Sequence, residues 1–188
     1  GMIMFEEILL DLEERAEKTQ HNTSKEMSVV RTGKASPALL DNIRVEVWGD
    51  KLPLKQVAGI SAPEPRLLVI QPWDASTAPA IAKAIEASDL GLRANIDGPV
   101  IRIPIPKLSD QRRKDLIKLV KKLAEEGKTS IRNIRRDAND SLKKACKSGS
   151  ITEDQEKKSL ADVQVIVDKA VKEIDRLLKL KEEDILEI

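Results

Sequence analysis

Cysteine, histidine and aromatic residues are almost absent from this chain of 188 residues, which has one Cys, one His, no Tyr, one Phe and two Trp. One Cys cannot close an intrachain disulfide, and one Cys with one His cannot form a Cys/His metal cluster. A histidine-based catalytic triad would depend on His21 alone. We therefore expect no metal and no cofactor, and a reducing compartment fits the cysteine usage.

Long uncharged runs are also missing. No uncharged stretch exceeds eight residues, whereas a membrane-spanning helix needs about 20 apolar residues. The N-terminal segment turns acidic at Glu6 and Glu7 and lacks the basic and apolar regions of a secretory signal or the arginines of a transit peptide. We expect a soluble, cytoplasmic protein with no membrane partner.

Charge is abundant, and it is divided unevenly along the chain. Residues 1–30 carry 3 basic and 7 acidic side chains, residues 107–147 carry 14 and 6, and residues 148–188 carry 7 and 11. A segment with a balance of +8 therefore lies between acidic flanks, although the whole chain has a net charge of only +1. Such an asymmetry favours a polyanionic partner.

Proline and glycine divide the chain into regions of different structure. All nine prolines lie between Pro37 and Pro106. Residues 2–30 contain neither Pro nor Gly and have the apolar spacing of a helix. Within 31–106, alternating residues predict strands at 43–47 and 67–70, a helix from Asp74 or Ser76 to Ala87, and a hairpin that turns at Asp97–Gly98. The first strand is expected to turn at Gly49–Asp50.

Two long helices are predicted after Pro106. The first begins after the N-cap Ser109 and ends at Gly149; the second is capped by Thr152, with Gln155 at the capping-box position. The apolar seam of the second helix runs from Leu160 to Leu177, and Lys181 occupies the place of the next apolar residue. At ~1.5 Å per residue these helices are roughly 50 to 60 Å long, so they predict a slender bundle.

The predicted fold class is α+β, a long three-helix bundle with a small inserted α/β, sandwich-like domain. Residues 1–30 and 107–188 form the bundle, and residues 31–106 form the insertion. The chain crosses between the two parts twice, and these crossings are the expected hinge. The hinge residues are Val30, Arg31, Thr32, Gly33, Pro104, Ile105 and Pro106.

The cations of the first long helix fall on one stripe when each residue is turned by 100°. The stripe lies beside the apolar face, is roughly 35 Å long and contains Arg113, Lys121, Lys128, Arg132, Arg135 and Arg136. No acidic residue occurs between Lys128 and Arg136, so few intrahelical ion pairs are expected. Phosphate and shape recognition of folded RNA fits such a stripe, whereas base stacking needs more aromatic residues than the chain has.

Other candidate sites have simpler explanations. His21 is expected on an exposed helix face, Cys146 near a helix end has no evident role, and Trp73 is expected to anchor the core of the inserted domain. Thr32–Gly33 lacks the strand and lysine of a P-loop. The adjacent Glu125 and Glu126 do not face each other on a helix, so no active site is predicted.

Four separated motifs resemble the bacterial ribosome recycling factor family. They are RTGKASPALLDNIRVEVWG at 31–49, QPWD at 71–74, SDLGL at 88–92 and IRNIRRDAND at 131–140. The resemblance runs from the first helix to the C-terminus and agrees with the family's L-shaped, tRNA-like fold. Trp48 stands where the family usually has Tyr.

The resemblance implies a translation factor that binds the post-termination ribosome. With elongation factor G and GTP it would split the subunits and release mRNA and tRNA, and it would act as a monomer and not as an enzyme. The inserted domain would contact elongation factor G. Large-subunit ribosomal RNA would meet Arg113, Arg132 and Arg135, with their neighbours Arg112, Asn133 and Arg136.

Two other classes of function remain open on the residues alone. A coiled-coil adaptor or chaperone-like protein would use the apolar edge of the bundle, and an enzyme is a more distant alternative. Co-sedimentation with large ribosomal subunits that falls with rising salt separates an RNA-binding factor from an adaptor.

Overall fold

The computed structural model describes residues 4–187 and divides them into two compact units. One unit contains residues 4–31 and Asp110–Glu187, and the other contains Thr32–Ser109. The expected arrangement of a helical bundle with a small inserted domain is confirmed. The predicted start of the first helix at Met2 lies outside the described residues.

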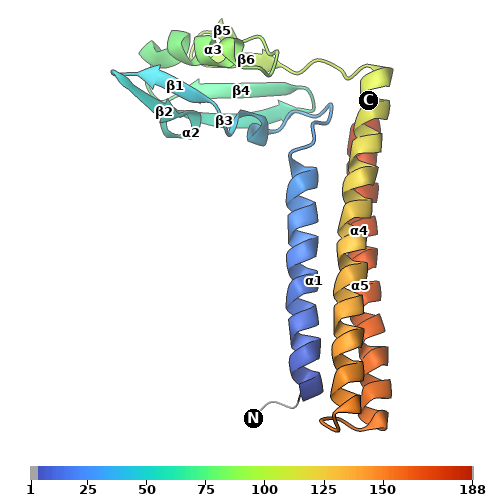
Figure 1. Cartoon of the computed structure of the whole chain (residues 1–188). Coiled ribbons are helices and arrows are strands. Elements are labelled where there is room, and N and C mark those ends of the chain that lie inside the picture. Colours follow the sequence, from blue (N-terminus) through green and yellow to red (C-terminus); the bar gives the residue numbers. More distant parts are fainter. Residues whose placement is uncertain (1–3, 188) are drawn as a thin grey trace. The chain divides into compact units, whose positions relative to one another are not determined.

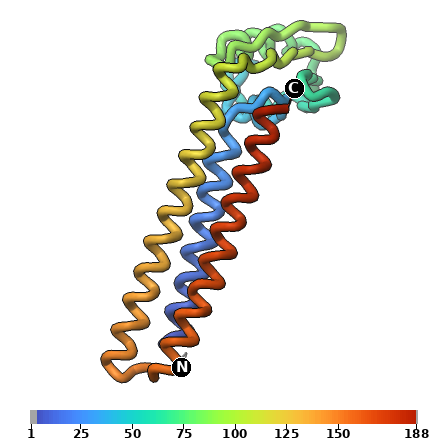
Figure 2. Tube along the Cα trace, turned by 90° about the vertical axis from the view of Figure 1, so that its right-hand side faces the viewer, coloured from blue at the N-terminus to red at the C-terminus, as the bar shows by residue number. Residues whose placement is uncertain are grey.

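Three helices form the first unit: α1 (Met4–Ser28), α4 (Asp110–Lys147) and α5 (Glu153–Leu186). They run side by side, with α4 opposite in direction to the other two (Figures 1 and 2). Their shared core buries small and aliphatic side chains at helical spacing: Leu12, Ala16, Met27, Ala124, Ile131, Ile134, Ala138, Leu142, Ala145, Val163, Val167, Ala170 and Ile174. Burying each large aliphatic side chain contributes about 1.5–3 kcal/mol.

The ends of the long helices are fixed by local chemistry. α4 begins immediately after Ser109, as predicted. Thr152 Oγ1 accepts a hydrogen bond from Gln155 N at 3.1 Å, and Gln155 Oε1 accepts one from Thr152 N at 2.9 Å. This capping box satisfies two backbone N–H groups at the start of α5.

The second unit contains six strands in two sheets. β1 (Arg44–Val47) and β2 (Asp50–Pro53) form an antiparallel hairpin, while β3 (Ala58–Glu64), β4 (Leu67–Pro72), β6 (Val100–Pro104) and β5 (Asn95–Asp97) form an antiparallel sheet in the order β3-β4-β6-β5. The short helices are η1 (Pro37–Leu40), α2 (Leu54–Val57), η2 (Ala75–Thr77) and α3 (Ala78–Ala87). Alternating residues of β4 and β6 are buried in one core with Ile81 and Ile85 of α3.

Three expectations for this unit were wrong. The β5–β6 hairpin turns at Gly98 and Pro99, one residue later than the expected Asp97–Gly98, because Asp97 pairs with Val100. The β1–β2 turn consists of Trp48 and Gly49, one residue earlier than expected, because Val47 pairs with Asp50. Both turn residues have positive φ, 50° and 76°, as a two-residue turn between twisted strands requires. Trp73 is not a core anchor: it is 69% exposed, and a Cβ added at Gly59 would lie 3.1 Å from its ring atom Cη2. The Trp73 ring therefore lies over the backbone of the edge strand β3.

Candidate nucleic-acid interface

The cations of α4 occupy positions that the core leaves on the outside of the helix. Every third or fourth residue, from Leu116 to Ala145, is buried toward α1 and α5. The intervening positions carry lysine and arginine, so packing of the apolar seam determines where the charges point.

Most of the predicted RNA-binding side chains are exposed. This group consists of Arg112, Lys121, Arg132, Asn133, Arg135 and Arg136. Among residues 4–187, Lys121, Arg135 and Arg136 make no ion pair with a carboxylate. These three cations keep their charge available for an external anion.

Arg113 and Lys128 are mostly covered, unlike the rest of the group. The Arg113 side chain is 15% exposed, and its Nη1 lies 3.1 Å from Asp110 Oδ1. Its Nε is buried without a hydrogen-bond partner among the described residues. The Lys128 side chain is 17% exposed, pairs with Asp175 of α5 and lies 3.7 Å from Glu125.

The expectation of few ion pairs in the stripe was wrong: Arg113 pairs with Asp110, and Lys128 and Arg132 also have acidic partners. Glu125 Oε2 lies 3.8 Å from Arg132 Nη2, so one carboxylate is shared between the two cations. The acidic partners of Lys128 and Arg132 lie outside residues 128–136: Glu125 precedes them on α4, and Asp175 belongs to α5. Because Arg132 remains 58% exposed, its pair with Glu125 is a weak surface pair.

The expected hinge residues fall at different places in the two units. Val30 is buried, and its N–H donates to the Met27 carbonyl at 3.1 Å. Pro104 pairs with Leu67 in the sheet. Ile105 is buried in the core of the small unit and donates to the Arg66 carbonyl at 2.8 Å. The structure thus includes Pro104 and Ile105 in the small unit, whose boundary falls at Ser109, three residues after the expected one.

The remaining reactive side chains considered from the sequence, His21 and Cys146, lie on different helices, α1 and α4. His21 is exposed, as expected. Burial raises the pKa of the Cys146 thiol, and Glu156 and Glu153 add to the rise, so this thiol is a poor nucleophile. Between residues 4 and 187, no group of three or more His, Cys, Asp and Glu side chains could hold a metal ion, and no helix is long and apolar enough to span a membrane.

Comparisons with known proteins agree with this geometry. The family described as "Ribosome recycling factor" matches residues 23–186. The chain is 51% identical to the ribosome-recycling factor of Halalkalibacterium halodurans and 49% identical to that of Finegoldia magna, in each case over 98% of this chain and all of the relative.

Two solved structures extend the likeness to three dimensions. A solution structure of the ribosome recycling factor matches all of this chain and all of its own, with a TM-score of 0.76 and 36% identity. The T. thermophilus ribosome recycling factor, described together with E. coli elongation factor G bound to the E. coli post-termination complex, matches with a TM-score of 0.66 and 42% identity over 97% of this chain and 99% of its own.

Proposed function

Because this chain belongs to the ribosome recycling factor family, we propose that it binds large-subunit ribosomal RNA through the exposed cations of α4. Its function is ribosome recycling. It acts on the post-termination ribosome together with elongation factor G, and with GTP it separates the subunits and frees mRNA and tRNA. The elongation factor supplies the GTPase, and this chain acts as a monomer, without catalysis, in the cytoplasm.

The observation that carries the RNA contact is the group of cations without an intramolecular partner. Lys121, Arg135 and Arg136 are exposed and unpaired within residues 4–187, and Arg132 gives up only a weak surface pair on binding. These cations can therefore bind phosphate at little cost in free energy from broken ion pairs. Each phosphate contact also releases condensed counterions from the RNA. Arg113 and Lys128 contribute less, because each is mostly covered and already paired.

The small unit is the part that contacts elongation factor G in this proposal. It has a hydrophobic core of its own and is joined to the bundle by two chain crossings. Two crossings restrict its motion to a hinge-like rotation. The expected hinge of residues 30–33 and 104–106 is extended to Ser109, because Ile105 is fixed in the small unit.

The test is co-sedimentation of the Arg132→Ala/Arg135→Ala variant with large ribosomal subunits. We expect at least tenfold weaker binding, about 1.4 kcal/mol, and a shallower dependence on salt, since each lost phosphate contact reduces the slope by about one. The melting temperature should change little, because both side chains are exposed.

Arg176→Ala is the matched control. Arg176 on α5 is as exposed as Arg132, 58% in each case, and its removal should leave binding unchanged. The proposed interface is wrong if the double variant binds like the unaltered chain, or if the control loses as much affinity. An adaptor protein would stay in the supernatant in every case.

A further inference from the structure

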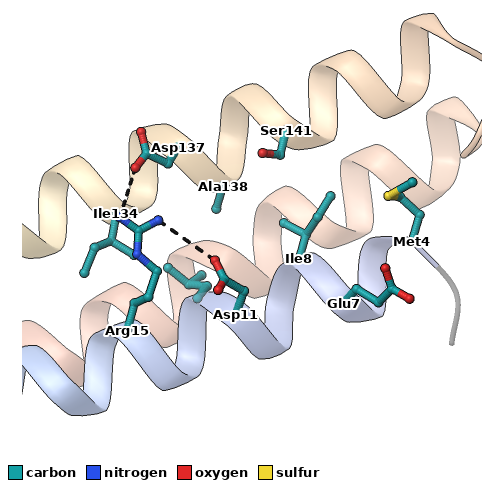
Figure 3. A pocket seen from close by; sticks show the side chains of 10 residues that line it. Met4, Glu7, Ile8, Asp11, Arg15, Ile134, Asp137, Ala138 and Ser141 are labelled. Atoms are coloured by element: carbon teal, nitrogen blue, oxygen red, sulfur yellow. Dashed lines mark hydrogen bonds and ion pairs between the residues drawn. The ribbon is translucent and has the colours of Figure 1, made fainter.

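A small groove between α1 and α4 has no part in the proposed RNA contact. Its volume is about 190 Å³. Its apolar lining includes Ile8, Ile134 and Ala138 (Figure 3). Leu12 also lines the groove. Ligand pockets for drug-sized molecules occupy about 300–1,000 Å³, so this groove is suited to a single aliphatic side chain.

The rim of the groove is acidic. Arg15 reaches from α1 toward α4, where its Nη2 lies 3.1 Å from Asp137 Oδ2, and its Nη1 lies 3.9 Å from Asp11 Oδ2 (Figure 3). Glu7 also lines the groove. Two carboxylates thus pair with one guanidinium, while Glu7 lies toward the other end of the groove (Figure 3). The side chains of Asp11 and Asp137 remain 68% and 57% exposed.

Each of these acidic residues also has a role within the fold. Glu7 lies in the first turn of α1, where the helix dipole favours a negative charge. Asp11 and Asp137 lie away from the ends of their helices. They pair instead with Arg15. The rim nevertheless holds three carboxylates and one guanidinium beside the apolar floor, so its excess of negative charge complements a ligand that is both apolar and cationic.

The charges of α4 separate this groove from the RNA stripe. Asp137 is about 140° around the helix from Arg132 at 100° per residue. A phosphate backbone is repelled by the carboxylates of the rim, and the groove lining contains no aromatic side chain on which a base could stack. An RNA occupant is therefore disfavoured, while a basic protein segment is complementary in charge.

We infer that this groove docks a short basic peptide segment of a partner protein. One aliphatic side chain lies on the apolar floor, and flanking lysine or arginine side chains pair with Glu7, Asp11 and Asp137. The inference does not rest on the proposed function, because it involves the α1-facing side of α4 and none of the exposed cations of the stripe.

The experiment is a titration of the full ¹⁵N-labelled chain, followed by amide chemical shifts, with two synthetic peptides. One is Lys-Lys-Leu-Lys-Lys and the other has serine in place of leucine. We expect shifts confined to the groove residues of α1 and α4, and at least tenfold tighter binding of the leucine peptide. Affinity should fall with rising salt.

Three variants locate the site. Glu7→Gln/Asp11→Asn should weaken the leucine peptide at least fivefold. The matched control Glu13→Gln/Glu17→Gln removes the same charge from exposed positions of α1 outside the groove lining and should change affinity less than twofold. Ser141→Phe should block the groove, because Ser141 lines it and is exposed, so a larger side chain there does not disturb the core.

Several outcomes would overturn the inference. If the two peptides bound equally well, the peptides would be attracted to the surface charge only, and the groove would not bind the leucine side chain. Equal losses in the charge variant and its control would exclude the groove, as would the absence of shifts at millimolar peptide. RNA would be the occupant of the groove if a short RNA displaced the peptide both from the unaltered chain and from the Arg132→Ala/Arg135→Ala variant. That variant should otherwise bind the peptide normally even if it no longer binds ribosomal subunits.

Discussion

Lys181 is a residue whose charge conflicts with its position on α5. It follows the apolar seam of that helix and is half-buried. Burial lowers the pKa of its ammonium group, and the negative charge of Asp184 partly opposes the shift. The folded state therefore binds a proton at Lys181 less tightly than the unfolded chain does, whose ordinary pKa is 10.5.

We predict that Lys181→Met stabilises the chain by about 1 kcal/mol at neutral pH. Methionine continues the apolar seam and has no charge to desolvate. The unaltered chain should gain stability as the pH rises from the folded pKa toward 10.5, because the unfolded state binds more protons over that range. The advantage of the variant should therefore shrink at alkaline pH.

Urea denaturation at pH 7 and near pH 10 measures this difference. Lys179→Met is the control, since Lys179 is exposed on the same helix and its replacement should have little effect. A stability difference independent of pH would show that desolvation of the ammonium group is not the cause.

For single residues, the sequence predicts which face of a helix a side chain occupies, but it does not predict the partners of that side chain on other helices. A turn of 100° per residue predicts that Arg113 lies beside the apolar face of its helix, and its side chain is in fact mostly buried. Pairing of Lys128 with Asp175 depends on the register between α4 and α5. The position of the Trp73 ring depends on Gly59 of β3, because glycine has no side chain there and leaves room for the ring.

At the scale of the helices, Gly127 of α4 packs closely against α1 and α5. A Cβ at this position would lie 2.5 Å from Thr23 Oγ1 and 3.2 Å from Ile174 Cδ1. Thr23 is buried, and a β-branched side chain in a helix has few alternative rotamers. Glycine in a helix costs about 1 kcal/mol relative to alanine, so its presence here is explained by the approach of the helices.

We predict that Gly127→Ala destabilises the chain by about 1–2 kcal/mol. A contact of 2.5 Å places the overpacking cost at about 2–3 kcal/mol, in the upper part of the usual range, and the gain in helix propensity offsets about 1 kcal/mol of it. Urea denaturation measures the effect. Thr23→Ala removes the nearest obstacle, so the double variant Thr23→Ala/Gly127→Ala should show a favourable coupling in a double-mutant cycle. Equal stability of Gly127→Ala and the unaltered chain would contradict this prediction, because the cost of overpacking would then only cancel the gain in helix propensity of about 1 kcal/mol.

Secondary structure was predictable where its cause is local. The capping box at Thr152 and the start of α4 depend on residues within one turn, and both were predicted from the sequence. Strand β3 was not anticipated, since its residues pair with β4 across a register shift between Ser61 and Glu64. The position of the Trp48–Gly49 turn likewise follows from cross-strand pairing and not from the glycine alone.

For the whole molecule, the two units have separate cores. We predict that the bundle folds without the small unit when Arg31 is joined to Asp110 by a flexible Gly/Ser linker. All buried contacts of its core come from α1, α4, α5 and the α4–α5 turn. Circular dichroism should show a highly helical monomer with a cooperative melt that still sediments with large ribosomal subunits.

An unfolded product would mean that residues 32–109 are needed for the bundle core. A folded product that no longer sediments with the subunits would mean that the small unit contributes to binding.

The insertion itself was predictable because prolines are confined to one region of the sequence. Its end at Ser109 was not, because the burial of Ile105 depends on packing within the small unit.

The discontinuous bundle has a consequence for the order of events during synthesis. α1 leaves the ribosome before α4 and α5, yet these later helices cover its apolar face. The small unit is continuous in sequence and has all its strands available before α4 is made. Once residues 32–109 have left the ribosome, the nascent chain therefore carries a complete small domain and an uncovered α1, and the bundle cannot close until α5 has been made.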